Sequence, residues 1–255
     1  MIKIATWNVN SIKVRLPYVL QWLESYAPDI LALQETKTLD EHFPCEAISQ
    51  LGYHIICSGQ KTYNGVALLS KSAASSVITS IVQLNDPQKR ILAATIDGVR
   101  ILNLYVPNGQ AVGSEKYAYK LDWLAKMHDY IQQQLLEFDK LVVLGDFNIA
   151  PEDCDVHDPQ IWQDGVLVSS AEREAFQGLL DLGLQDGFRL HEQAGGYYTW
   201  WDYRRGAFRR DMGLRIDHIL LSAPLAEQCK ACDIDKEPRG WERPSDHAVV
   251  WVELG

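Results

Sequence analysis

The sequence predicts an α/β protein in which two sheets pack face to face with helices on the outside. Three observations lead to this prediction. Apolar runs of strand length alternate with amphipathic stretches of helical length. The segment 53–105 is dense in short β-rich runs separated by turn signals. No repeat, low-complexity tract or Pro/Gly-rich linker interrupts the 255 residues, so we expect a single domain covering 1–255.

The first 35 residues are typical of a strand, a helix and a second strand. Ile2–Asn8 reads as a buried strand. Ser11 is placed to cap a helix that carries apolar residues at Val14, Leu16, Val19, Leu20 and Leu23. Asp29–Leu33 is the second buried strand, and Gln34-Glu35 follow it directly.

The β-rich segment that follows is expected to form an antiparallel meander. Asn64-Gly65 and Asp97-Gly98 are two of the turn signals that separate its runs. The predicted strands are His54–Cys57, Gly65–Ser70, Ser76–Val82, Arg90–Ile96 and Arg100–Tyr105.

The second half of the chain adds two helices and four more strands. Ser114–Phe138 and Ser170–Leu182 have helical patterns, and Ser169 or Ser170 can cap the latter. The predicted strands are Lys140–Leu144, Tyr197–Trp201, Leu214–Leu221 and Ala248–Glu253.

Composition limits the classes of function. No apolar stretch is long enough to span a membrane and no signal peptide is recognisable, so we expect a cytoplasmic protein. Five scattered cysteines indicate reduced thiols, and we interpret the Cys229-x-x-Cys232 pair as structural rather than metal-binding or redox-active.

The charge distribution leaves two interpretations open. A net charge of −10 argues by itself against nucleic acid, because phosphate contacts need Lys and Arg. However, five arginines fall in one short stretch, and they form either a solvated loop or a local phosphate-binding patch. They are Arg204, Arg205, Arg209, Arg210 and Arg215.

Polar residues recur where the predicted apolar strands end. Each alone is an ordinary turn former. As a set they offer oxygen and nitrogen ligands and no thiolate, which favours a hard cation such as Mg²⁺ over zinc. Such a site suits phosphodiester hydrolysis, where a cation offsets the charge of the phosphate. The set comprises Asn8, Asn10, Glu35, Tyr105, Asn108, Asp146, Asn148, Asp217, His218, Asp246 and His247.

Seven motifs in order resemble those of the endonuclease/exonuclease/phosphatase superfamily, and within it the exonuclease III and abasic-endonuclease branch. The resemblance covers essentially the whole chain and implies a four-layer α/β sandwich with two mainly antiparallel sheets flanked by helices. The motifs are Trp7-Asn8-Val9-Asn10, Leu33-Gln34-Glu35-Thr36-Lys37, Asn64-Gly65-Val66-Ala67, Leu104-Tyr105-Val106-Pro107-Asn108-Gly109, Gly145-Asp146-Phe147-Asn148, Leu214-Arg215-Ile216-Asp217-His218 and Ser245-Asp246-His247.

The resemblance implies a Mg²⁺ site, in which Mn²⁺ can substitute, and a set of catalytic groups. Asp146 would activate the water or protonate the leaving oxygen, and Asp217 would orient His247, which is either a base or a phosphate ligand. The implied metal residues are Asn8, Glu35, Asp146, Asn148, Asp246 and His247. The implied catalytic residues are Tyr105, Asp146, Asn148, Asp217 and His247.

The resemblance also implies a DNA-binding face. Trp200, Leu214 and Ile216 would line a pocket for an unpaired sugar, and the arginine loop would reach a groove. The implied DNA-binding residues are Asn10, Lys61, Tyr63, Leu167, Trp200, Arg204, Arg209, Arg210, Met212, Leu214 and Ile216.

These observations predict a monomeric, Mg²⁺-dependent DNA-repair phosphodiesterase. The expected substrates are duplex DNA with blocked or recessed 3′ ends or with abasic sites, and the expected reactions are 3′–5′ exonuclease, 3′-phosphatase and incision 5′ to an abasic site. Two alternatives remain: a phosphodiesterase of the same fold that acts on RNA or phospholipid, and a nucleic-acid-binding regulator without catalysis.

Leu167 departs from the family pattern. Members of the branch have a small residue and then an aromatic one before the helix that contains Glu172, whereas this chain has Leu167-Val168. If the register is right, Leu167 fills space next to the sugar pocket, which predicts that 3′-end processing exceeds abasic-site incision. A register error of one or two residues is the alternative explanation.

Overall fold

The computed structural model describes residues 1–255 and contains two six-stranded sheets packed against each other. The first sheet has the order β11 (Cys229–Asp235), β12 (Val249–Leu254), β1 (Ile2–Asn8), β2 (Ile30–Gln34), β4 (Val66–Ser70) and β3 (His54–Ser58). The second has the order β5 (Ser75–Ile78), β6 (Ile91–Ile96), β7 (Val99–Tyr105), β8 (Leu141–Asp146), β10 (Asp217–Leu221) and β9 (Gln185–Asp186).

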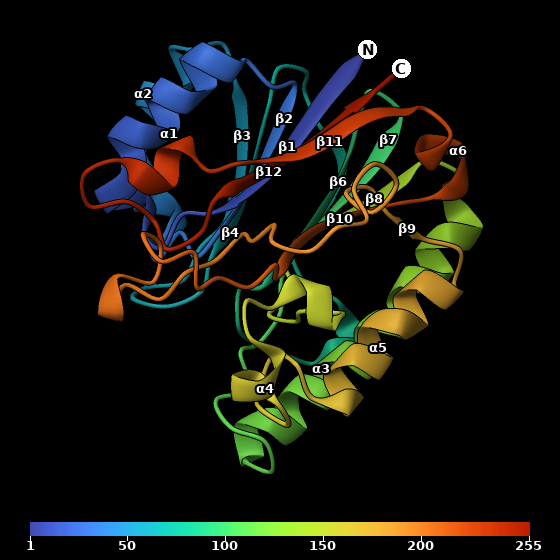
Figure 1. Ribbon diagram of the computed structural model, residues 1–255. Coiled ribbons are helices and arrows are strands. Elements are labelled where there is room, and N and C mark those ends of the chain that lie inside the picture. Colours follow the sequence, from blue (N-terminus) through green and yellow to red (C-terminus); the bar gives the residue numbers. More distant parts are fainter.

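Each sheet is antiparallel except for one parallel pair, β1 with β2 and β7 with β8. The helices cover the outer faces, so the molecule has four layers (Figure 1). The helices are α1 (Ile12–Tyr26), α2 (Cys45–Ser49), α3 (Glu115–Glu137), α4 (Pro159–Trp162), α5 (Ser170–Asp181) and α6 (Ala223–Ala226). The predicted four-layer α/β sandwich is confirmed, and no helix has the length and apolar character needed to cross a membrane.

Strand alternation divides the apolar side chains among three core regions. Residues such as Ile4, Val142 and Ile219 fill the space between the sheets. Their neighbours along the strands face outward, as Trp7 does toward α1 and Val143 does toward α3 and α5. Because one row of each central strand points between the sheets, polar residues that end those rows meet at one edge of the sandwich.

A buried hydrogen-bond network joins the two sheets below that edge. The Gln34 side-chain nitrogen donates to Thr6 Oγ1 and to Asn103 Oδ1, both at 2.8 Å. Asn103 in turn donates to the carbonyl oxygens of Leu33 and Ala67. Buried polar groups are costly unless they are satisfied, so this network fixes the sheets relative to each other just beneath the strand ends.

Several predicted elements differ from the structure. The expected meander is divided, because β3 and β4 belong to the first sheet while β5, β6 and β7 belong to the second. Tyr197–Trp201 is not a strand and makes only isolated bridges through Trp200. The predicted strand 214–221 begins only at Asp217. Ser11 is the N-cap residue of α1, but its side chain accepts no capping hydrogen bond.

The edge strand β11 was missed. Its sequence, Cys-Lys-Ala-Cys-Asp-Ile-Asp, has only one of the β-branched and aromatic residues that usually mark a strand, Ile234. Only Cys232 and Ile234 are buried, at alternate positions, and pairing with β12 supplies the rest of the stabilisation. Charged residues at such an edge also disfavour pairing with another chain.

Candidate active site

Strand pairing places three of the predicted catalytic residues side by side in the second sheet. Tyr105 at the end of β7 is the register partner of Asp146 on β8, and Asp146 is the partner of Asp217 on β10. The first sheet contributes Asn8 at the end of β1 and Glu35 just after β2. The two sheets therefore bring their polar strand ends to one place.

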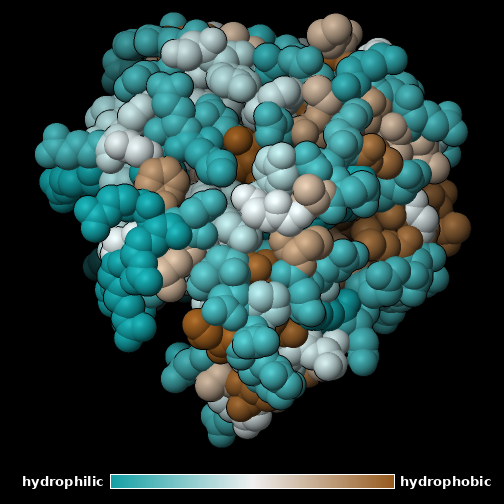
Figure 2. All heavy atoms as spheres, viewed as in Figure 1, coloured by the Kyte–Doolittle hydropathy of each residue, from teal (hydrophilic) through white to brown (hydrophobic).

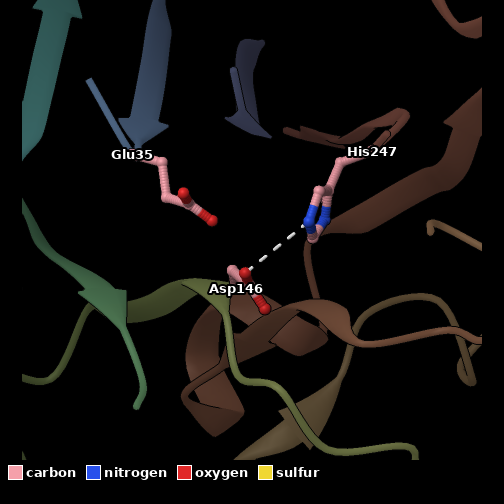
Figure 3. Close-up of side chains that lie close together, drawn as sticks. All are labelled: Glu35, Asp146 and His247. Carbon is pink, nitrogen blue, oxygen red and sulfur yellow. Dashed lines mark ion pairs between the residues drawn. The ribbon is translucent and has the colours of Figure 1, made fainter. Parts of the chain in front are cut away.

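Glu35, Asp146 and His247 converge on a single space (Figure 3). One ligand atom from each lies within 4.8 Å of the other two. The amide nitrogen of Asn8 bridges the two carboxylates, at 2.9 Å from Glu35 Oε1 and 2.8 Å from Asp146 Oδ2. We refer to Glu35, Asp146, His247 and Asp217 below as the catalytic cluster.

Asp217 orients the His247 imidazole. The Nδ1 atom lies 2.9 Å from Asp217 Oδ2, and Nε2 lies 3.8 Å from Asp146 Oδ2. Burial is the largest influence and lowers the pKa of His247, but Asp217 and Asp146 together outweigh it and raise that pKa to about 10. The imidazole is therefore held as a cation that can donate a hydrogen bond from Nε2.

Asp146 is wholly buried and its charge is only partly compensated. Burial raises the pKa of Asp146, His247 opposes that change and Asp217 reinforces it, so that the pKa is about 7. The backbone nitrogen of Asn148 donates to Asp146 Oδ1 at 2.9 Å. A carboxyl group with this pKa can take up or release a proton near neutral pH, as a general acid or base must.

Tyr105 and Asn148 contribute polar groups on the other side of the cluster. Burial, and then the charges of Glu35 and Asp146, raise the pKa of Tyr105, so its hydroxyl stays protonated as a donor. The Asn148 backbone has a φ of 51°, and its side chain donates to Val106 O and accepts from Asn108 Nδ2.

The donor set fits a hard cation, since two carboxylates converge with space between their oxygens. Not every predicted metal residue belongs to that set. Asn8 directs its amide nitrogen at the carboxylates while its oxygen accepts from the Asn10 backbone nitrogen. The amide of Asn148 hydrogen-bonds elsewhere. In this arrangement Glu35 and Asp146 are the residues that would hold the ion.

Asp246 is held slightly apart from the convergent groups. Its two oxygens accept from Asn10 Nδ2 at 2.9 Å and from Trp200 Nε1 at 3.0 Å. Burial is the largest influence and acts to raise the pKa of Asp246, but His247 and the two hydrogen bonds lower it overall. Asp246 therefore stays ionised beside the catalytic cluster.

A family model named Endonuclease/Exonuclease/phosphatase family matches residues 5–247, from β1 to His247. The chain belongs to this family. The match includes every residue of the catalytic cluster, so the family resemblance deduced from the seven motifs is confirmed.

Curated relatives of the family align over nearly the full chain. Exodeoxyribonuclease III of Haemophilus influenzae is 36% identical over 265 residues and covers 99% of each protein. DNA repair nuclease APEX1 of Danio rerio is 30% identical, over 99% of this chain and 82% of that protein.

Solved structures of family members superpose closely. The 3′ phosphatase NExo from Neisseria, bound to product DNA hairpin, has 48% identity and a TM-score of 0.98 with complete coverage of both chains. An AP endonuclease from Archaeoglobus fulgidus has 40% identity and a TM-score of 0.94, over 100% of this chain and 99% of that one.

Two lysines next to the site were not singled out from the sequence. Lys37 Nζ lies 2.7 Å from Glu35 Oε2 and also contacts Asn10 Oδ1. Lys120 is fully buried, pairs with Glu172 and donates to the carbonyl oxygens of Asn148 and Asn108. The sequence could have indicated Lys120, because this charged residue falls on the apolar stripe of the helix Glu115–Glu137.

The residues predicted to line a sugar pocket lie together, but their side chains are packed. Leu167, Leu214 and Ile216 are all buried in one cluster, and Trp200 packs against it. Leu167 therefore lies in the same cluster as Leu214 and Ile216, and its register against the family pattern stays a prediction. Leu167 has a φ of 78°, a conformation that costs a side-chain-bearing residue about 1–2 kcal/mol and that glycine adopts freely.

The arginine stretch divides into two parts. Arg204, Arg209 and Arg210 are exposed, and Met212 is half-buried. Arg215 is buried and bound to Asp155 and Asp186, so its inclusion in a phosphate-binding patch was wrong. The alternation of side chains along the extended segment 214–221 turns Arg215 inward, whereas the preceding loop faces solvent.

Lys61 and Tyr63 belong to the loop between β3 and β4, apart from the arginine loop. Both are exposed, and the Tyr63 side chain is 67% accessible. Tyr63 borders a cavity of about 570 Å³ that reaches Tyr105 and Asn108. The contacts of both loops with DNA stay predictions.

Proposed function

We propose that the protein is a Mg²⁺-dependent phosphodiesterase that processes 3′ ends in duplex DNA. The observation that carries this proposal is the convergence of Glu35, Asp146 and His247 at the meeting point of the two sheets. The names of its relatives, which include exodeoxyribonucleases, a 3′ phosphatase and AP endonucleases, support DNA as the substrate. A cytoplasmic location and a monomeric state stay predictions from the sequence.

Glu35 and Asp146 would hold the cation, which when bound offsets the negative charge of the phosphate. His247 is positioned by Asp217 to donate from Nε2 to a phosphate oxygen, so we favour the phosphate-ligand role over the base. Tyr105 can donate from its hydroxyl group to the same phosphate, while Asp146 exchanges a proton with water or the leaving oxygen. The two roles proposed for Asp146 draw on its two carboxylate oxygens.

We further propose that 3′-end processing exceeds incision at abasic sites. Leu167 is buried in the same cluster as Leu214 and Ile216, the residues expected to line the pocket for an extruded sugar. Overpacking of a filled site costs about 1–3 kcal/mol, which corresponds to about fivefold to 150-fold in rate. A 3′ terminus can fray and has no continuous strand to extrude, so it escapes this cost.

Single-turnover cleavage of three matched duplexes tests both statements. The duplexes carry a 3′-phosphate, a recessed normal 3′ end, or an internal abasic site. We expect wild-type enzyme with Mg²⁺ to remove the 3′-phosphate at least about fivefold faster than it incises the abasic site. Leu167→Gly should narrow that gap.

Val156→Ala is the matched control, because it removes methyl groups from the same apolar cluster without opening the space at Leu167. In this variant the ratio of the 3′-phosphate removal rate to the abasic incision rate should equal that of the wild-type enzyme. Abasic incision by wild-type enzyme that equals or outruns 3′-phosphate removal would contradict the proposed preference, and an absence of all three reactions would contradict the proposed function itself.

A further inference from the structure

A second cavity lies outside the catalytic cluster, between α4 and the arginine loop. Its volume is about 360 Å³, within the range of small-ligand sites. In Figure 1 the two segments, yellow and orange, face each other at the lower left, and the surface in Figure 2 is recessed there. We call it the outer pocket; the lining used below is Ile161, Trp162, Trp200, Arg204, Arg205 and Met212.

The floor of the outer pocket is aromatic and apolar. The rings of Trp162 and Trp200 stand nearly perpendicular, at 84°, with their centroids 6.4 Å apart. Ile161, which belongs to the four-residue helix α4, is 72% exposed. A large apolar side chain exposed at a cavity next to a half-buried tryptophan gains little for folding, and such patches mark binding sites.

The rim of the outer pocket is cationic. Arg204 and Arg205 are exposed, and Arg204 pairs only with Asp202 at the surface. Asp202 also lines the pocket, but two adjacent exposed guanidinium groups outnumber it, and beside an aromatic floor they are complementary to a phosphate and its base. Aromatic platforms combined with cationic edges are the means by which proteins bind unpaired nucleotides.

Trp200 connects the outer pocket to the catalytic cluster. Its Nε1 donates to Asp246 Oδ2 at 3.0 Å, and its backbone bridges to His247. Trp200 also packs against the buried apolar cluster that contains Leu167. A nucleotide that leaves the duplex next to His247 meets this packed cluster, whereas the outer pocket is open.

We propose that the outer pocket binds the nucleobase of an unpaired 3′-terminal nucleotide during exonucleolytic cleavage. The base stacks on Trp162 and contacts Ile161, while Arg204 and Arg205 face the adjoining backbone phosphates. This inference rests on the proposed function, because it needs a scissile phosphate at the catalytic cluster.

The proposal makes different predictions for two reactions that break the same bond, the one between phosphorus and the upstream 3′ oxygen. In exonuclease action, water attacks the phosphorus, the bond to the upstream 3′ oxygen breaks, that oxygen takes up a proton, and a 5′-mononucleotide leaves. In 3′-phosphate removal the same bond breaks and inorganic phosphate leaves. Only the first reaction has a nucleoside beyond the scissile phosphate, so only the first uses the outer pocket.

Trp162→Ala tests the proposal in single-turnover reactions with Mg²⁺. The three substrates are one duplex ending in a mismatched 3′ adenosine nucleotide, a 3′ tetrahydrofuran abasic nucleotide, or a 3′-phosphate. Loss of stacking should slow removal of the adenosine nucleotide by about tenfold to a hundredfold. Removal of the abasic nucleotide and of the phosphate should stay within about twofold of wild type.

Further variants distinguish binding from folding. Trp162→Phe keeps an aromatic face and should restore most of the lost rate. Ile161→Ser changes an exposed residue and should slow only the adenosine substrate, by a smaller factor. Leu136→Ala, an exposed apolar residue on α3, is the control and should change nothing.

Equal losses on all three substrates in Trp162→Ala, or no loss on any, would overturn the proposal while leaving the proposed function intact. A wild-type enzyme that removes neither the phosphate nor either nucleotide would instead overturn the proposed function, and the inference with it.

Discussion

Adjacent residues of β10, Asp217 and His218, belong to two buried polar clusters that differ in charge balance. Asp217 points between the sheets into the catalytic cluster, whereas His218 points outward into a cluster of ion pairs. The ion-pair cluster consists of Asp155, Asp186, Arg189, Arg215 and His218. The comparison shows how one strand can serve catalysis on one face and stability on the other.

The difference in charge balance appears in the pKa values of His218 and His247. Burial lowers the pKa of His218 to about 4, and the neighbouring Arg215 acts in the same direction. His247 is equally buried, yet the carboxylates around it raise its pKa to about 10. In the ion-pair cluster two guanidinium groups match two carboxylates. Around His247, carboxylates are in excess, and that excess of negative charge would attract a cation.

The largest expected effect comes from altering the catalytic cluster. Asp146→Asn and His247→Ala should each slow 3′-phosphate removal by about 10²–10⁴-fold, because general acid–base and phosphate-positioning groups contribute that much. Thermal melting of Asp146→Asn should change little, since it relieves part of the excess buried negative charge, whereas His247→Ala leaves Asp217 without its partner and should melt at a lower temperature. Single-turnover rates and melting curves of the same preparations provide the check, and wild-type rates in both variants would contradict the assigned roles.

Removing a partner from the ion-pair cluster should lower stability and leave activity intact. Arg215→Met leaves Asp155 and Asp186 buried without their partner and should lower the free energy of unfolding by about 3–5 kcal/mol. Activity per folded molecule should survive. Denaturant titration measures the loss.

Lys126→Ala is the control for that titration. It removes an exposed helix pair with Asp122 and should cost at most about 0.5 kcal/mol. If Arg215→Met proved no more destabilising than this control, the ion-pair cluster would not be what stabilises the fold.

The smallest effect is a pH dependence of stability from His218. Its Nε2 donates to the Ile149 carbonyl oxygen at 2.9 Å, and its Nδ1 faces Arg215 at 3.1 Å, so the folded protein resists protonation. The unfolded chain binds a proton below about pH 6.5 and the folded chain only below about pH 4. Stability contributed by neutral His218 is therefore present above pH 6.5 and lost as the pH falls toward 4.

The expected slope for that loss approaches about 1.4 kcal/mol per pH unit. His218→Gln removes the titrating group, so subtracting its unfolding curve from the wild-type curve isolates this contribution. If the free energies of unfolding of the two proteins changed in parallel between pH 6.5 and 4, His218 would not contribute to the pH dependence of stability.

The layers and the strand ends could be predicted from the sequence because they follow from local patterns. Apolar strands such as Ile2–Asn8 and Leu141–Asp146 carry their polar residues at the end, and a period of two fixes which face those residues share. The family resemblance then identified Glu35 and His247, which no local pattern relates to Asp146.

What the sequence could not show depends on long-range pairing. Arg215 lies next to four exposed arginines in sequence, and only its ion pairs with Asp155 and Asp186 reveal its burial. The division of the meander between two sheets is likewise decided by which strands meet, not by their composition. The outer pocket joins α4 to a loop some 40 residues further along the chain, a contact that no spacing predicts.

The most direct test of the central claim, that catalysis arises at the cluster with excess carboxylates, is metal dependence of 3′-phosphate removal. Enzyme treated with EDTA should show no turnover, and Mg²⁺ or Mn²⁺ should restore it, because the carboxylates of the catalytic cluster outnumber their cationic partners and repel a phosphate. Glu35→Gln should raise the Mg²⁺ concentration needed for half-maximal rate. Full turnover by wild-type enzyme in metal-free buffer would contradict the account.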